Sequence, residues 1–327
     1  MLRFTKMHGL GNDYVYISTF DQHVDAPEQL ARRISDRHRG VGADGLILVA
    51  PPEAPDAHVR MIMFNADGSR AEMCGNGIRC LAKLAWERGL ARHNPLRVQT
   101  DRGVLTLDLN VDPAGRVREV RVDMGAPVLD PARIPVNLPG GMVVNVPFPL
   151  ILMRGANARE AGAAAGTAGA AAGAVHAAGP SEDAELAPPR RTPVTAAPVN
   201  LHLTAVSMGN PHAIFFVDDV AAVPLADWGP RIERHELFPA RTNVHFVQVL
   251  APDRVRMITW ERGAGATQAC GTGASAVGVA GVLNALTQPV ITAELPGGEL
   301  RIEWDPRTKH VYKTGPAEEV FTGEWPE

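Results

Sequence analysis

The chain contains one sequence pattern twice, and this internal duplication constrains its fold more than any other feature. Residues 59–65 read VRMIMFN and residues 255–261 read VRMITWE, an offset of 196 residues. The same offset separates Cys74 from Cys270, and each cysteine begins a Cys-Gly-polar-Gly run, CGNG or CGTG. Matches that keep their order along the chain are typical of a repeated structural unit. The sequence therefore predicts two similar halves.

Further pairs fit this duplication. Asn65 corresponds to Glu261 at the same offset, and Gly11-Asn12 corresponds to Gly209-Asn210 at an offset of 198. Both halves offer short runs rich in β-branched residues and bounded by Gly, Pro or Asp, which is typical of strands. In the first half these runs cover 13–18, 45–50, 59–65, 96–100, 104–110 and 117–125. In the second half they cover 201–209, 213–219, 243–250, 255–261, 290–295 and 299–305.

One helix is expected directly after each cysteine. In the first, Ile78, Leu81, Ala82 and Ala85 recur at the spacing of one helix face. The second, SAVGVAGVLNAL, is apolar or small on every side, as a helix enclosed by a sheet should be. The expected fold class is therefore α/β (α+β): two lobes, each a mixed β-sheet wrapped around a central helix.

Composition excludes several functions. The net charge of −4 over 327 residues leaves no basic surplus for nucleic-acid phosphates. The N-terminal residues lack the apolar core of a signal peptide, and no strongly apolar run is long enough to span a membrane. Three cysteines are too few for a disulfide scaffold, and an odd number cannot all pair within the chain. We expect a protein of the reducing cytoplasm.

The expected domain boundaries follow the duplication. Residues 1–125 would form the lobe that carries Cys74, and residues 126–327 the lobe that carries Cys270, with a last strand near 312–327 free to return to the first lobe. Residues 151–198 are dominated by Ala, Gly and Pro. Such a composition offers little apolar surface to bury against its ordering entropy. We expect a disordered or loosely helical surface insertion there.

The paired cysteines suggest a chemistry. A helix start framed by glycines presents free backbone N–H groups and the positive end of the helix dipole. The same field favours a thiolate. Two such sites facing one cleft could hold a carboxylate and place one sulfur on each side of its α-carbon. One thiolate would remove the α-proton and the other thiol would return a proton to the opposite face, with no cofactor and no metal. Cys80, inside the first helix pattern, is expected to be an inert core thiol.

The chain resembles the diaminopimelate epimerases over almost its whole length, leaving out the insertion. The matching stretches are MHGLGNDY, DRHRGVGADGL, FNADGSRAEMCGNGIRC, SMGNPHAIFFV, NVHFVQV and ERGAGATQACGTGASA. The resemblance implies two α/β lobes with the active site in the cleft between them. It implies a cofactor-independent isomerase that interconverts LL- and meso-2,6-diaminopimelate, on the route to lysine and peptidoglycan. Homodimers occur in the family, and the sequence gives no independent sign of one.

The resemblance also implies roles for individual residues. Cys74 and Cys270 would be the acid and the base, supported by His212 and Glu261. The helix starts at Gly75-Asn76 and Gly271-Thr272 would bind the reacting α-carboxylate. The rest of the pocket would be lined by Asn12, Asn65, Asn210, Asn243, Glu261 and Arg262, with Arg262 gripping the distal carboxylate. The chain departs from some members at Gly45, where they place a Gln that contacts substrate; Gly45 is the counterpart of Asn243.

Two alternatives fit the same residues. A proline or hydroxyproline racemase-like enzyme would invert another amino acid with the same pair of thiols. Arg262, Asn65 and Asn243, however, favour a substrate with a second charged end. From a different class, the two cysteines could form a redox switch in a binding protein, if their Cα atoms lie within about 7 Å. A GxGxxG match at residues 40–45 precedes a strand instead of linking strand to helix, so it does not indicate a dinucleotide site.

Overall fold

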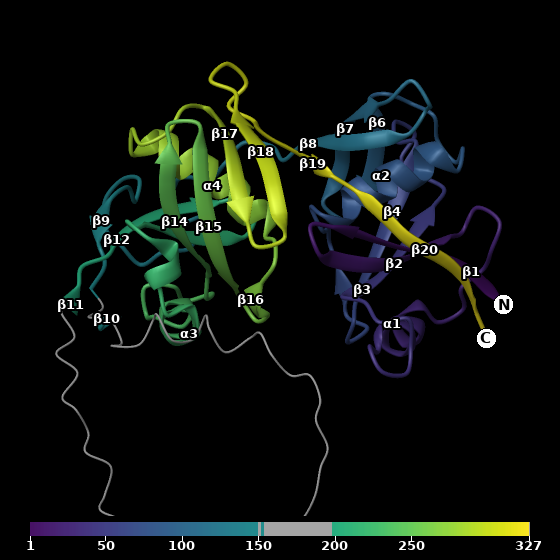
Figure 1. Ribbon diagram of the computed structural model, residues 1–327, viewed down its shortest axis with the longest axis horizontal. Coiled ribbons are helices and arrows are strands. Elements are labelled where there is room, and N and C mark those ends of the chain that lie inside the picture. The colour runs from purple at the N-terminus through teal and green to yellow at the C-terminus, as the bar shows by residue number, and fades with distance from the viewer. Residues whose placement is uncertain (150–151, 154–197, 327) are drawn as a thin grey trace, which may run out of the picture.

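The computed structural model describes residues 1–149, 152–153 and 198–326, which form two lobes side by side (Figure 1). The first lobe contains β1 (Leu2–Gly9), β2 (Asn12–Ser18), β3 (Gly45–Ala50), β4 (Val59–Asn65), β5 (Arg70–Ala71), β6 (Leu96–Thr100), β7 (Gly103–Val111), β8 (Val117–Asp123), α1 (Pro27–Ser35) and α2 (Gly77–Glu87). The second contains β9 (Val146–Pro147), β12 (His202–Ser207), β13 (Pro211–Phe216), β14 (Asn243–Ala251), β15 (Arg254–Glu261), β16 (Gly265–Thr267), β17 (Val290–Leu295), β18 (Gly298–Trp304), η1 (Val220–Ala222), α3 (Leu225–Glu233) and α4 (Gly271–Leu283).

The strand pairings confirm the duplication. In the first lobe β2 pairs in parallel with β3, β3 antiparallel with β4, and β4 in parallel with β6. The second lobe repeats this order and these directions with β13, β14, β15 and β17. The register repeats as well: Tyr14 lies opposite Gly45, and His212 opposite Asn243. Both residue pairs are related by the offset of 198 found in the sequence.

The two predicted central helices are confirmed. α2 buries Ile78, Leu81, Ala82 and Ala85 completely, so the predicted face packs inward. α4 is buried almost all round from Gly271 to Gly281, as its uniformly small and apolar composition predicts. Each helix begins within three residues of its cysteine, so its N-terminus is fixed beside the thiol by the packing of the whole lobe.

The sheets of the two lobes meet at the last strands of the chain. β19 (Val311–Pro316) pairs antiparallel with β18 on one side and with β8 on the other, which joins the lobes into one 18-stranded sheet within the described residues. β20 (Glu318–Trp325) then runs along the first lobe, antiparallel to β1 (Figure 1). The ends of the expected insertion form a short pair, β10 (Leu152–Met153) with β11 (Pro198–Val199), and its remainder lies outside the described residues.

Candidate active site

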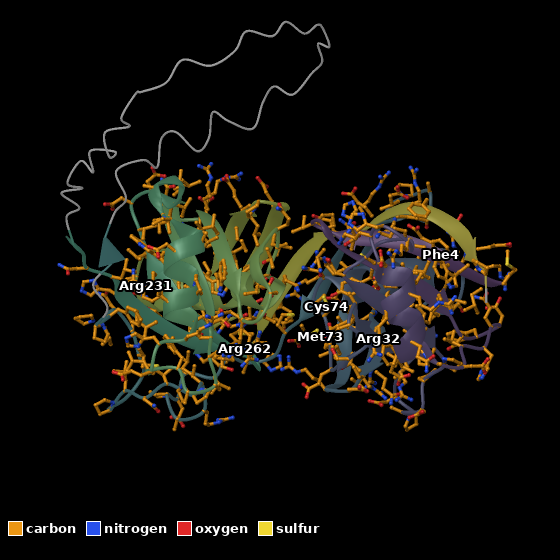
Figure 2. All side chains as sticks on the ribbon, turned by 90° about the horizontal axis from the view of Figure 1, so that it is seen from below. Phe4, Arg32, Met73, Cys74, Arg231 and Arg262 are labelled. Carbon is orange, nitrogen blue, oxygen red and sulfur yellow. The ribbon has the colours of Figure 1, made fainter. Side chains whose placement is uncertain are left out.

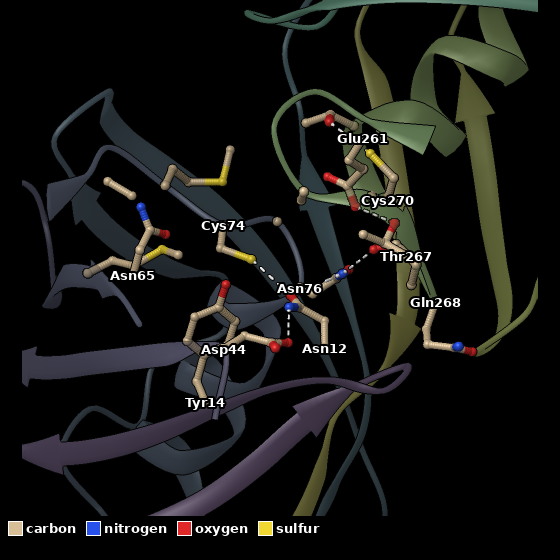
Figure 3. Close-up of a pocket in the computed structure, with 18 of the residues that line it drawn as sticks. Asn12, Tyr14, Asp44, Asn65, Cys74, Asn76, Glu261, Thr267, Gln268 and Cys270 are labelled. Carbon is tan, nitrogen blue, oxygen red and sulfur yellow. Dashed lines mark hydrogen bonds between the residues drawn. The ribbon is translucent and has the colours of Figure 1, made fainter. Parts of the chain in front are cut away.

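A cleft of about 1210 Å³ lies between the lobes and is lined by residues of both. It brings together most of the residues that the sequence analysis singled out: Asn12, Asn65, Cys74, Gly75, Asn76, Asn210, Glu261, Arg262, Cys270, Gly271 and Thr272. Cys74 and Arg262 lie on facing edges of the two lobes (Figure 2). The thiols of Cys74 and Cys270 lie on opposite walls of the pocket (Figure 3). All three cysteines of the chain are free thiols.

Cys74 is held at the start of α2 by hydrogen bonds from both sides. The backbone N–H of Gly77, the first helical residue, donates to Sγ at 3.4 Å. The thiol donates to Oδ1 of Asn12 at 3.3 Å. Asn12 is itself fixed, because its Nδ2 donates to the Asp44 carboxylate at 2.7 Å. A thiolate at this position would therefore receive an N–H donor and the positive end of the helix dipole.

Cys270 occupies the equivalent position at α4 in a drier and more negative setting. It is buried, and Sγ lies 3.6 Å from the Thr272 hydroxyl. Burial raises the pKa of the Cys270 thiol, and the nearby Glu261 carboxylate raises it further. Burial also raises the pKa of Glu261, whose carboxylate accepts a hydrogen bond from Thr267 at 2.6 Å. Cys270 therefore keeps its proton in the resting cleft.

His212 does not line the cleft but lies buried directly behind it. Its Nε2 is 3.0 Å from Oδ1 of Asn210, and its Nδ1 is 2.9 Å from Nε2 of His245. His245 in turn lies 3.0 Å from the Thr259 hydroxyl. Burial lowers the pKa of His245 to about 3. Burial also lowers the pKa of His212 well below the ordinary range, and the neighbouring His245 and Arg262 act in the same direction. Both imidazoles are neutral and fix the orientation of Asn210.

Together with Cys270, the two buried histidines form the one group of three possible metal-ligand side chains found in the described part of the chain. The ligand atoms of His212, His245 and Cys270 lie within 4.8 Å of one another. The two imidazoles, however, are engaged in the hydrogen bond that joins them. A soft metal ion could take this site only by breaking that bond and capturing the Cys270 thiol.

Asn243 also lies behind the cleft wall and not on its surface. Its Nδ2 donates to the Pro211 carbonyl at 2.8 Å, and its Oδ1 accepts the backbone N–H of Arg262 at 3.0 Å. Asn243 thus fixes the backbone from which the Arg262 side chain enters the cleft. Its counterpart Gly45 has no room for a side chain, since a Cβ there would lie 2.2 Å from the Phe64 carbonyl oxygen. The missing side chain at Gly45 is a packing requirement of this lobe.

Sequence reasoning missed several residues of the site. Tyr14, Asp44 and Arg102 line the cleft, and Arg102 reaches across the lobes to the Met208 carbonyl at 3.4 Å.

Beneath the cleft lies Lys313 of β19, which is fully buried and was also missed. One signal could have found it: in VYKTGP, alternation places the lysine in phase with inward-facing Val311 and Gly315.

Comparison with known proteins agrees with this geometry. The sequence model of the family described as diaminopimelate epimerase matches residues 4–129 and 204–320. A diaminopimelate epimerase of Pelotomaculum thermopropionicum is 47% identical over 328 residues, covering 99% of each chain. One from Acetivibrio thermocellus is 43% identical and covers 99% of this chain and 98% of the relative.

Solved structures of similar fold are more distant in sequence. A hydroxyproline epimerase from Agrobacterium vitis, with bound trans-4-hydroxy-L-proline, superposes with a TM-score of 0.61 at 12% identity. It covers 98% of this chain and 90% of its own. A PhzF-family phenazine biosynthesis protein of Bacillus anthracis gives a TM-score of 0.60 at 14% identity and covers 100% of this chain and 99% of its own. Among the described residues, no helix is long and apolar enough to cross a membrane.

Proposed function

The chain belongs to the diaminopimelate epimerase family, and we propose that Cys74 and Cys270 invert the α-carbon of diaminopimelate by two-base proton transfer. The activity is that of an isomerase acting on diaminopimelate, which interconverts the LL and meso forms. The observation that carries the proposal is the placement of two free thiols on opposite walls of one cleft, each beside a helix N-terminus.

The reaction needs a base on one face of the α-carbon and an acid on the other. Cys270 holds its proton in the resting cleft, so a turnover that starts there begins with Cys74 as the base. The proton passes from the α-carbon to Cys74, and the proton of Cys270 is delivered to the opposite face. The substrate ammonium beside Glu261 would offset the negative charge that raises the pKa of Cys270, which prepares this thiol for the base role in the reverse direction.

Charge that develops on the substrate is stabilised by the helix starts. The α-carboxylate would accept hydrogen bonds from backbone N–H groups at Gly75-Asn76 and Gly271-Thr272, and the enediolate formed on deprotonation strengthens them. Asn76 links the two sides, because its Nδ2 donates to the Ala269 carbonyl of the other lobe at 3.3 Å. This hydrogen bond ties the start of α2 to the residue that precedes Cys270. Arg262 would bind the distal carboxylate with its bidentate fork.

The test is an assay of substrate choice. The purified protein, reduced and without added cofactor, is incubated with LL-diaminopimelate, L-proline and trans-4-hydroxy-L-proline, and the stereoisomers are separated. We expect meso-diaminopimelate as product and no inversion of either imino acid. Arg262→Met should raise KM for diaminopimelate far more than it lowers kcat, because it removes binding of the distal end in the ground state. Inversion of proline by the wild type would overturn the proposed substrate.

We infer from family membership that the protein works as a homodimer in the cytoplasm. The three free thiols support a reducing compartment. Light scattering after gel filtration should give twice the 34.9 kDa of one chain. A mass of one chain at working concentration would refute the dimer.

A further inference from the structure

Lys313 lies at the junction of the lobes, where no lysine would be expected. It is fully buried in the middle of β19, and its partners in the sheet are Val122 of β8 and Ile302 of β18. Lysine is rarely buried without an ion-pair partner. No carboxylate of the described residues forms an ion pair with it, and its one hydrogen bond runs to the Gly75 carbonyl at 2.9 Å. Its position therefore needs an explanation other than packing.

The side-chain nitrogen of Lys313 lies against both helix starts at once. A Cβ built on Gly75 would be 2.4 Å from Nζ, and one built on Gly271 would also be 2.4 Å from it. These glycines directly follow the two catalytic cysteines, one in each lobe. The lack of side chains at Gly75 and Gly271 is what admits the amine to this place. Lys313 is thus shared by two sites that the duplication otherwise keeps apart.

Charge at this place opposes folding. The N-terminal ends of α2 and α4 carry partial positive charge, which disfavours a cation nearby. Arg79, also fully buried, donates to the same Gly75 carbonyl at 3.2 Å and adds a second positive group. A buried cation beside another cation and two helix N-termini destabilises the fold unless negative charge arrives. Cys74 and Cys270 can become negative, and both interact with the Lys313 amine.

We propose that Lys313 is a positioning residue for the two-thiol reaction: its side-chain nitrogen, shared by the two helix starts, stabilises negative charge on whichever cysteine is deprotonated. The inference rests on the proposed function and deepens it. A reversible epimerase must use each cysteine as base in turn, so a single amine that serves both sides supports both directions. The duplicated lobes supply one thiol each, and the crossing strand β19 supplies the shared charge.

The titration behaviour of the groups around Lys313 supports this role. Burial and the nearby Arg79 together lower the pKa of Lys313 to about 7, and Cys74 and Cys270 act in the opposite direction. The interaction is mutual, so a protonated Lys313 would stabilise a thiolate on either cysteine. The groups that face it from β8 and β18 are apolar. The amine is therefore poised to respond to the thiols near neutral pH.

Lys313→Met tests the proposal, because methionine keeps most of the volume and removes the charge. The matched control is Lys83→Met, which removes a partly buried lysine that pairs with Glu87 at 2.6 Å, away from the cleft. The acidic limb of the kcat/KM profile for LL-diaminopimelate should move up by about one pH unit or more in Lys313→Met. At pH 7.5, kcat should fall about tenfold or more with KM little changed. The control should keep the wild-type profile.

A second readout does not depend on turnover. The rate of alkylation of Cys74 and Cys270 by iodoacetamide, followed by mass spectrometry as a function of pH, should show the same upward shift in Lys313→Met. An unchanged alkylation profile in the folded variant would overturn the proposal. So would a raised KM with no change in either pH profile, since that would make Lys313 a substrate-binding residue. Failure of the wild type to epimerise diaminopimelate would instead refute the proposed function and leave the alkylation result to decide on Lys313.

A measurement on the wild type covers the case in which Lys313→Met does not fold. The chain has four lysines, so side-chain NMR of protein labelled at lysine Cε follows each amine separately. One amine should titrate near pH 7, and its pKa should fall once both thiols are capped with iodoacetamide, because capping prevents thiolate formation. Four amines that all titrate near their ordinary value of 10.5 would refute the inference.

Discussion

Replacing Lys313 by methionine should change how the stability of the protein depends on pH. Burial lowers the pKa of Lys313 from 10.5 to about 7. Between these values the unfolded chain binds one more proton than the folded chain, so the free energy of unfolding rises with pH. The slope for one proton is about 1.4 kcal/mol per pH unit. Below pH 7 both states are protonated, and this contribution no longer changes.

The variant lacks this titration. Lys313→Met should be more stable than wild type at pH 7, because a buried charge has been replaced by an apolar side chain of similar size. Its advantage should shrink by about 2 kcal/mol between pH 7.5 and 9, as wild type recovers stability by losing the proton. The buried thiols Cys80 and Cys270 titrate in the opposite sense above pH 9, and they do so in both proteins.

The assay is urea unfolding under reducing conditions at pH 7.0, 7.5, 8.0, 8.5 and 9.0, with Lys83→Met as the control. The quantity to compare is the difference in the free energy of unfolding between variant and wild type at each pH. A difference that does not change with pH would show that Lys313 keeps an ordinary pKa in the folded protein. That result would refute the account of its burial.

Two further substitutions probe the second lobe. Gly273→Ala would place a Cβ 2.3 Å from Cε1 of the buried His245, so it should lower the free energy of unfolding by about 1–3 kcal/mol and reduce kcat. The control Gly141→Ala meets nothing within 4 Å and should leave thermal melting and kcat unchanged. Equal melting temperatures of the two variants would contradict this packing. Glu261→Gln removes the charge that raises the pKa of Cys270. Alkylation of Cys270 at pH 8 should therefore speed up about tenfold for each unit by which this pKa falls. Slower or unchanged alkylation would contradict this effect of Glu261 on Cys270.

Much of the fold could be predicted because its signals are local and occur twice. The strand runs alternate or are bounded by turn residues, and the helices that follow Cys74 and Cys270 carry patterns that match their burial. The shared offset then related the halves without any knowledge of contacts. The sequence left open whether the last strand returns to the first lobe, and it did not predict the continuous sheet, because the pairing of β8 with β19 joins segments almost 200 residues apart. Nothing in either strand alone specifies that partner.

The residues of the site likewise fall into those that the sequence predicts and those that only the structure shows. Residues inside the repeated motifs, such as Asn12 and Asn210, could be predicted to reach the cleft because each has a counterpart. The residues behind the wall lack a counterpart of similar chemistry: His245 corresponds to Ile47, and Lys313 lies on the strand that crosses between the lobes. The chemistry of these residues depends on burial and on neighbours distant in sequence. His212 and Asn243 were singled out, but only the structure shows that they act on Asn210 and on the Arg262 backbone.

The proposed mechanism requires that two thiols exchange protons on opposite faces of one carbon. Its most direct test is the early phase of the reaction of LL-diaminopimelate in D₂O, with deuterium at the α-carbon measured separately in the meso product and in the recovered substrate. Two-base transfer predicts deuterium in the product and almost none in the recovered substrate. Cys74→Ser and Cys270→Ser should each lose epimerisation by several orders of magnitude while remaining folded. Equal labelling of substrate and product at early times, or either variant retaining wild-type epimerisation, would rule out two-base transfer by these thiols.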